Sequence, residues 1–262
     1  MDVRSLSPSA VRLLQLCGEA FRRRYVEGER TSFGLPAAIG NATHRAAEHS
    51  LTSKRDLDEL PSKEEVQDVT ADAFTEQLSN PEFEDKDIKS TADLSAGKDM
   101  AISLSELHLG ELAPIVQPEI IEQRMEIEIP GYPLKLVGYA DVVEVDGTVR
   151  DLKTRGRKPK EADADDDIGL AWYAMQVEVL HGAPPPALAL DVLVKKKKPE
   201  AITVHTKPEE GHAPLLRRIE RATKVVQAGA YMPAEPGHWK CSEKFCDYWH
   251  DCPWGKSGRK QL

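Results

Sequence analysis

The sequence lacks any apolar run long enough to cross a membrane. A spanning helix needs roughly 18 or more apolar residues, and no stretch of the 262 residues approaches that length. The opening residues, MDVRSLSPSA, also lack the apolar core of a secretory signal peptide. We therefore expect a protein of the cytoplasm with no membrane partner.

Cysteine is scarce, with four residues in the chain. In a reducing compartment they are not expected to form structural disulfides, which leaves a metal or cluster site to consider. Cys241, Cys246 and Cys252 form a tight trio, and Cys17 is the only other thiol. Four thiolates suit zinc and an iron–sulfur cluster equally well, and taken alone Cys17 also fits a small apolar helix residue. Either metal would tie the two ends of the domain together.

Positive charge is not in excess, since the formal net charge is -9. Residues 51–100 carry 6 basic and 14 acidic residues, which leaves 29 basic and 30 acidic residues elsewhere. Local basic clusters occur at Arg22 to Arg24, within 155–160 and at Lys195 to Lys198. The cluster within 155–160 fits a DNA contact and a solvated loop equally, whereas Lys195 to Lys198 fits the guarded end of an edge strand.

The hydrophobic periodicity changes along the chain and shows no internal repeat. Helical spacing recurs over residues 8–21, 37–51, 61–78, 88–112, 168–180 and 208–227, and β patterns occupy 119–129, 134–145, 149–154, 187–194 and 201–206. This order predicts one α/β domain over 1–262, with a mixed central sheet flanked by helices. Residues 52–115 would be an acidic helical insertion, and 231–262 a cysteine-rich tail packing on the N-terminal helix.

Loop length in the predicted hairpin decides which acids face each other. A two-residue turn would pair Asp141 with Leu152. A three-residue loop with Gly147 in the left-handed position instead pairs Asp141 with Asp151. Because only the second register puts the valines of both strands on one face, we predict that the two acids share that face.

Two opposed carboxylates suggest metal chemistry. Directly opposed residues have β-carbons roughly 4.5 to 5.5 Å apart, so Asp141 and Asp151 could hold one hard cation. Lys153, diagonal to them, could hold a phosphate oxygen or orient a water whose pKa the cation lowers. His44 could complete the metal shell from its helix. An isolated Asp-x-Lys would be an ordinary surface salt bridge, but the combination points to metal-assisted phosphodiester hydrolysis.

Five segments of the chain resemble a known family. They are SPSAVRLLQLCGEAFRRRYVEG, GNATHRAAE, GYADVVEVDGTVRDLKT, WYA and WKCSEKFCDYWHDCPWG. Together they resemble the RecB-type nucleases of the PD-(D/E)XK superfamily, especially CRISPR-associated and phage exonucleases with an iron–sulfur cluster. The resemblance implies a restriction-endonuclease-like core.

The resemblance also implies roles for individual residues. His44, Asp141 and Asp151 look like Mg²⁺ or Mn²⁺ ligands and Lys153 like the catalytic lysine. The cysteines, whose spacing is looser than usual, look like ligands of a 4Fe-4S cluster, with zinc as the less favoured occupant: Cys17, Cys241, Cys246 and Cys252.

The next helix departs from the family pattern. Such helices carry a Gln four residues before a Tyr, and here Gly169 stands four residues before Tyr173. Tyr173 fits a catalytic or DNA-contacting residue and a half-buried helix aromatic equally. Gln176, one turn further along, is our hypothesis for the missing amide.

The resemblance extends the expected function to a DNA exonuclease acting on single-stranded or end-frayed DNA. It points to phage recombination, DNA end processing or CRISPR adaptation, with proteins of those processes or copies of the chain as partners, and to the host cytoplasm if phage-encoded. The alternatives are a catalytically impaired DNA-binding or protein-interaction module that retains the fold, and a zinc-stapled protein without catalysis.

Overall fold

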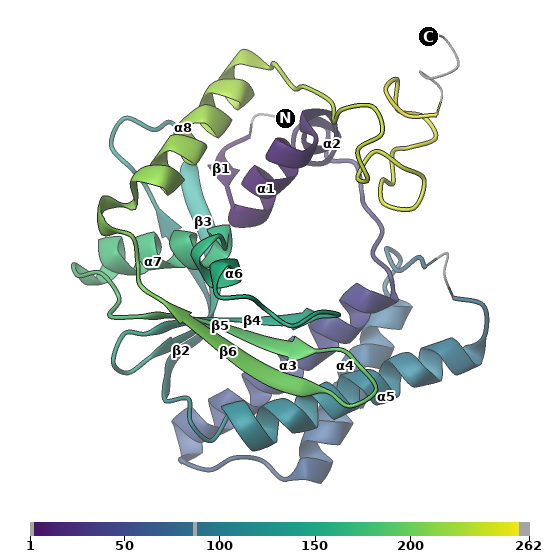
Figure 1. Cartoon of the computed structure of the whole chain (residues 1–262), viewed down its shortest axis with the longest axis vertical. Coiled ribbons are helices and arrows are strands. Elements are labelled where there is room, and N and C mark those ends of the chain that lie inside the picture. The colour runs from purple at the N-terminus through teal and green to yellow at the C-terminus, as the bar shows by residue number, and fades with distance from the viewer. Residues whose placement is uncertain (1–2, 86–87, 257–262) are drawn as a thin grey trace. The chain divides into compact units, whose positions relative to one another are not determined.

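The computed structural model describes residues 3–85 and 88–256 (Figure 1). The chain forms two compact units, each assembled from segments far apart in the sequence. Unit 1 takes residues 1–32, 126–138 and 210–262, and unit 2 takes 33–125 and 139–209. In the described part of the chain, no helix is long and apolar enough to span a membrane.

Six strands of the described chain pair in one mixed sheet. They are β1 (Ser5–Leu6), β2 (Pro118–Ile127), β3 (Lys135–Glu144), β4 (Val149–Arg155), β5 (Leu188–Val194) and β6 (Glu200–Thr206). Their order is β1-β3-β4-β5-β6, and β2 also pairs with β3. Strands β4 and β5 run parallel, whereas β3 with β4 and β5 with β6 run antiparallel. The predicted mixed sheet flanked by helices is confirmed.

One face of the unit 2 strands is covered by α7 (Ile168–His181), which follows the short α6 (Ala162–Asp165). Leu170, Ala174 and Val177 of α7 share a buried cluster with Val149 of β4 and Leu190 of β5. Strand β5 is buried along its whole length, as expected for a central strand covered on both faces. The mostly apolar segment 188–194 therefore forms a buried strand inside the sheet, between β4 and β6.

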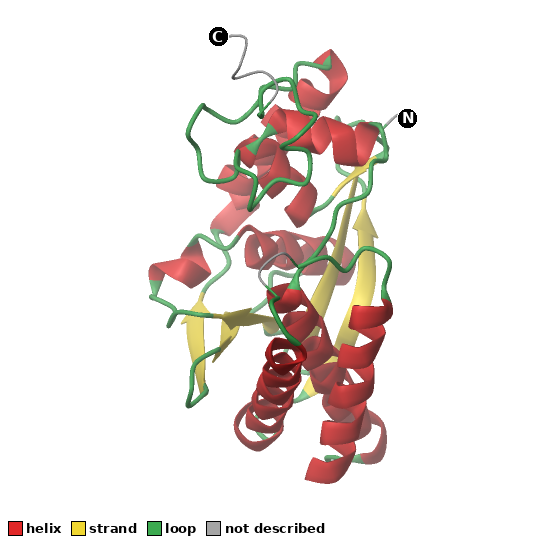
Figure 2. Cartoon of the chain, turned by 90° about the vertical axis from the view of Figure 1, so that its right-hand side faces the viewer, coloured by secondary structure: helices red, strands yellow, loops and turns green. Residues whose placement is uncertain are grey.

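The other face is covered by α3 (Leu35–Leu57), which packs with α4 (Lys63–Ser79), α5 (Thr91–Leu107) and the π-helical turn η2 (His108–Leu112). Helices α3, α4 and α5 contact one another and form the group of long helices in Figure 2. Ala38 and Ala42 of α3 pack in one cluster with Leu152 of β4 and Leu193 of β5. Small residues on α3 thus bring His44, further along the same helix, close to the sheet.

The hairpin between β3 and β4 has the predicted register. Val142 pairs with Arg150 and Val143 with Val149, the register that a three-residue loop gives. The three-residue loop is closed by the amide of Glu144, which donates to the carbonyl of Thr148 at 2.8 Å. Gly147 has φ +88°, in the left-handed region that glycine tolerates best. The choice of the three-residue loop is confirmed.

A buried ion network joins this hairpin to β5. Arg150 Nε donates to Glu144 Oε1 at 2.6 Å, and Arg150 Nη1 lies 3.0 Å from Asp191 Oδ2. The Asp191 Oδ1 atom also accepts a hydrogen bond from Thr203 Oγ1 of β6. The network connects four neighbouring strands, β3 to β6.

Unit 1 contains α1 (Pro8–Leu16), α2 (Gly18–Phe21), the π-helical turn η1 (Arg22–Val26), the 3-10 turn η3 (Glu210–His212) and α8 (Ala213–Ala228). The predicted single helix over 8–21 is wrong, because Cys17 leaves helical geometry with φ -162° and ψ 104°. The Cys17 Sγ instead accepts a hydrogen bond from the amide of Ala20, so Cys17 is the N-cap of α2. Residues 229–256, the described part of the chain after α8, form turns and loops. Within them, Tyr248 and Cys252 pack against Ala20.

Candidate functional site

Three candidate metal ligands meet at one point of unit 2. His44 Nδ1 on α3 lies 3.7 Å from Glu122 Oε1 on β2 and 3.8 Å from Asp141 Oδ2 on β3. One ligand atom of each residue lies within 4.8 Å of the others, and each side chain is half-buried. Carboxylate oxygens with one imidazole suit Mg²⁺ or Mn²⁺, so the donor set fits the cation that the sequence predicts.

Glu122 was not among the predicted site residues. It lies inside the predicted strand 119–129 and belongs to no motif in the sequence. Its φ of +46° is a left-handed conformation that non-glycine residues rarely adopt. Strained backbone of this kind is found preferentially at functional sites, but no sequence pattern announces it.

The side chain of Asp141 reaches from β3 to β4, the strand that carries Asp151. Asp141 lines a cavity with Val142 and Leu152, whereas Val143 belongs to the core on the α7 side. Asp141 Oδ2 accepts a hydrogen bond from the amide of Leu152 at 2.6 Å. Because this amide binds a side chain, the regular alternation of β3 is interrupted at Asp141.

The cavity beside the three ligands continues toward the buried ion network. His44, Glu122 and Asp141 line it together with Arg150 and Asp191. His108 also lines it, and burial lowers the pKa of that side chain to about 4. The imidazole of His108 is therefore neutral at physiological pH.

Asp151 and Lys153 form a close ion pair next to this group. Lys153 Nζ lies 2.5 Å from Asp151 Oδ2, and Asp151 is fully buried. Burial raises the pKa of Asp151 to about 7; Lys153 opposes this rise, and Asp141 adds to it. Burial alone would lower the pKa of Lys153, but the surrounding carboxylates raise it, so its ammonium stays charged.

The pKa values of Asp141 and His44 are shifted as well. Burial raises the pKa of Asp141, against the charges of His44 and Lys153. Burial lowers the pKa of His44, but Glu122 and Asp141 outweigh it and the net shift is upward. These carboxylates share a buried space, and a bound divalent cation would compensate their charge.

Helix α7 brings three further predicted residues to unit 2. Tyr173 packs partly buried against the core, and burial together with Asp151 raises the pKa of its phenol, which stays protonated. Gly169 lies near Asp151, as described below. Gln176 is fully buried and its Nε2 donates to the carbonyl of Met125 at 3.0 Å. The Gln176 amide, hypothesised to replace the missing Gln of the site, thus anchors α7 to β2.

The basic loop after β4 is extensively paired with acids. Arg155 and Arg157 both approach Asp163, with nitrogen to Oδ2 distances of 3.2 and 3.3 Å. Lys158 pairs with Glu200 at 2.7 Å. A DNA phosphate would have to compete with these carboxylates for the basic side chains.

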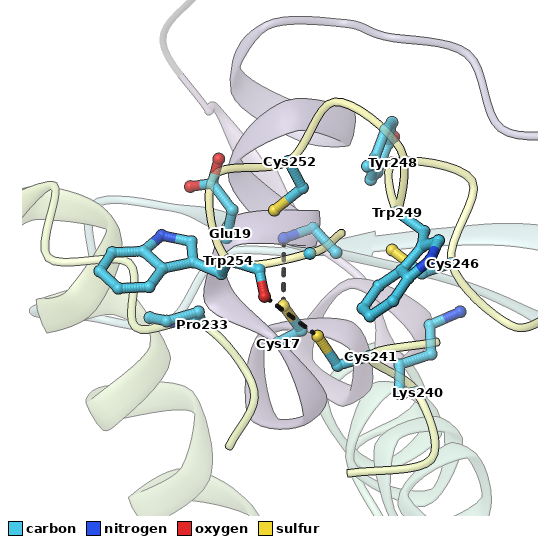
Figure 3. A pocket seen from close by; sticks show the side chains of 12 residues that line it. Cys17, Glu19, Pro233, Lys240, Cys241, Cys246, Tyr248, Trp249, Cys252 and Trp254 are labelled. Atoms are coloured by element: carbon cyan, nitrogen blue, oxygen red, sulfur yellow. Dashed lines mark hydrogen bonds between the residues drawn. The ribbon is translucent and has the colours of Figure 1, made fainter. Parts of the chain in front are cut away.

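The four cysteines line one pocket of unit 1 (Figure 3). All four are free thiols. The Sγ of Cys17 accepts weak hydrogen bonds from the amides of Ala20 and Ala234. Burial raises the pKa of Cys246 and of Cys252. The structure therefore gathers the four predicted thiolate ligands around one space.

Comparison with known proteins bears on this arrangement. A solved structure from Eubacterium rectale, of a candidate exonuclease, is 12% identical, covers 92% of this chain and 87% of its own, and gives a TM-score of 0.57. That of SSO0001 is 14% identical, covers 86% and 87%, and gives a TM-score of 0.34, too low to indicate a shared fold. No curated protein matches the chain significantly.

The first of these likenesses concerns the fold alone, because the identity is low. The sequence pattern of the PD-(D/E)XK nuclease superfamily, in contrast, matches residues 5–253, nearly the whole length. The chain therefore belongs to the PD-(D/E)XK nuclease superfamily.

Proposed function

We propose that this protein is a divalent-metal-dependent DNA exonuclease that hydrolyses phosphodiester bonds in single-stranded or end-frayed DNA. The observation that carries the proposal is the meeting of His44, Glu122 and Asp141 within 4.8 Å, beside the ion pair of Asp151 and Lys153. Nuclease chemistry follows from the family. The preference for DNA ends rests on the resemblance to RecB-type exonucleases and on the candidate exonuclease of similar fold.

In the proposed mechanism, His44, Glu122 and Asp141 would hold one Mg²⁺ or Mn²⁺. Such a cation, when bound, would supply a water of lowered pKa and compensate the charge of the leaving oxygen. Lys153, charged and held by Asp151, donates a hydrogen bond to a nonbridging oxygen of the scissile phosphate. Tyr173, protonated and partly buried on α7, would contact the DNA backbone.

We further propose that Cys17, Cys241, Cys246 and Cys252 hold an iron–sulfur cluster. The four thiols line one pocket of unit 1, and the resemblance to nucleases with a cluster favours a cluster over zinc. Its role would be to join the two ends of unit 1.

The biological setting stays a prediction from the resemblance: phage recombination, DNA end processing or CRISPR adaptation, in the cytoplasm. The same holds for partner proteins, a homo-oligomer and a single nuclease domain over 1–262. A catalytically impaired binding module is the second candidate, because Gly169 stands where the family carries Gln.

The test uses end-labelled linear single-stranded DNA and a closed circle of the same sequence, each with Mn²⁺. We expect the wild type to degrade the linear strand and spare the circle. Asp151→Asn and Lys153→Met should abolish degradation, whereas Lys224→Ala, which removes an exposed lysine of α8, should leave it unchanged. Equal degradation by the wild type and both site variants would refute the nuclease proposal. DNA binding without any cleavage would support the impaired module.

A further inference from the structure

At the first turn of α7, the residue next to Asp151 is a glycine, Gly169. Gly169 stands at the position where related helices carry Gln. A β-carbon built on Gly169 would lie 2.9 Å from Asp167 Oδ1, 3.6 Å from Tyr173 Cε2 and 3.8 Å from Asp151 Oδ1. Any side chain at position 169 would therefore enter a space bordered by two carboxylates and the tyrosine ring.

Asp167 is held in this position by several contacts. It is the N-cap of α7, and its Oδ1 accepts from the amide of Gly169 at 2.8 Å and more weakly from that of Leu170 at 3.4 Å. Its Oδ2 lies 3.5 Å from Arg155 Nη2 on β4. The residue is only 7% exposed. A buried carboxylate with these partners has a fixed orientation toward β4.

A side chain at residue 169 would collide with the Asp167 carboxylate in its present position. A β-carbon at 2.9 Å from Oδ1 is closer than such contacts allow, so the Asp167 carboxylate would have to shift. Glycine at 169 leaves this carboxylate undisturbed where it caps α7 and faces Arg155. The loss of the family's Gln and the presence of this buried acid are two aspects of one local arrangement.

We propose that Asp167 is a positioning residue of the nuclease site and takes the place that the family gives to Gln. The inference rests on the proposed function. Along β4, Asp151 pairs with Lys153 and Asp167 pairs with Arg155, so two ion pairs alternate along one side of the strand. The Asp167 carboxylate limits where Lys153 and Arg155 can turn, and its negative charge strengthens the binding of a cation at Asp151.

The test compares the full-length wild type with Asp167→Asn and Gly169→Gln. Asparagine is also a good N-cap, so Asp167→Asn removes the charge and keeps the cap. Asp166→Asn, in the same acidic run but exposed, is the matched control. Mn²⁺ affinity is measured from the loss of the free-ion paramagnetic resonance signal. An Asp141→Asn sample corrects for ions bound elsewhere. Thermal melting and DNA degradation are followed on the same samples.

We expect Asp167→Asn to bind Mn²⁺ about tenfold more weakly, as for partners of metal ligands, with a melting temperature close to that of the wild type. Gly169→Gln should weaken Mn²⁺ binding too, because it displaces Asp167, and should slow DNA degradation. Asp166→Asn should match the wild type.

Wild-type Mn²⁺ affinity in Asp167→Asn would overturn the proposal, whether or not its melting temperature changes. Faster degradation by Gly169→Gln than by the wild type would also overturn it, since the site would then merely lack its glutamine. If the wild type itself cleaves no DNA, the proposed function fails, but the Mn²⁺ affinities still decide the role of Asp167.

Discussion

Glu122 Oε1 on β2 lies 3.7 Å from His44 Nδ1 on α3. His44 belongs to a recognisable sequence motif, whereas Glu122 belongs to none. The contact depends on the left-handed backbone of Glu122, with φ +46°. In regular strand geometry the same side chain would follow the alternation of β2. The left-handed backbone costs roughly 1 to 2 kcal/mol and brings a third potential ligand to the candidate metal site.

Removing the Glu122 carboxylate should therefore weaken metal binding. Glu122→Gln is expected to lower Mn²⁺ affinity by about 10- to 100-fold, the range seen for groups that support a metal site. Isothermal titration of Mn²⁺ into the metal-free protein measures the effect. Glu119→Gln, an exposed residue of the same strand, is the control. Equal affinities for the two variants would contradict a ligand role for Glu122.

The stability of the metal-free protein should fall as pH rises through about 7. Burial raises the pKa of Asp151 to about 7, above the roughly 3.9 of an unfolded chain. An acid whose pKa is raised by folding contributes stability while protonated, and this contribution is lost as the folded-state pKa is passed. Melting scans from pH 5 to 8.5 should show a decline that Asp151→Asn lacks. Mn²⁺ should raise the melting temperature more at pH 8 than at pH 6.

That pH prediction has a clear contrary outcome. A decline of equal size in the wild type and in Asp151→Asn would assign it to other groups. A Mn²⁺ effect that is larger at pH 6 than at pH 8 would mean that protons do not compete with the cation at the site.

The buried ion network should be costly to break. Arg150→Met would leave Glu144 and Asp191 buried without their shared cation. We expect the free energy of unfolding to fall by about 3 to 5 kcal/mol, as for a buried pair that loses one partner. Urea titration measures it, with the exposed Arg217→Met on α8 as control. A change below about 1 kcal/mol, the size of a surface pair, would contradict the prediction.

The cysteine pocket gives a spectroscopic prediction. Anaerobically purified protein should be brown and contain iron and acid-labile sulfide, because thiolate-ligated clusters absorb visible light. Cys246→Ser should lower the iron content and the absorbance. Ser242→Ala, in the same turn region, should leave both unchanged. A colourless protein with one equivalent of zinc would show that zinc is the occupant.

The hairpin and the helix start of α7 differ in how far sequence could describe them. The register around Gly147 could be predicted because loop length and valine parity allow only one consistent face. The position of Asp167 is indicated by the sequence, because an acid directly before a helix is a typical N-cap. Glu122 has no such indication, because its left-handed backbone depends on tertiary contacts. The sequence does not show the interruption of strand geometry at Asp141, because it depends on the hydrogen bond from the amide of Leu152 to the Asp141 side chain.

Unit 1 combines the first 32 residues with segments that begin at residues 126 and 210. During synthesis on the ribosome, Phe21, fully buried in the finished protein and stacked on Tyr231, emerges long before that partner exists. Cys17 is likewise synthesised long before Cys241, Cys246 and Cys252, with which it lines one pocket. Unit 1 can therefore be completed only after the segment that begins at residue 210 has been synthesised.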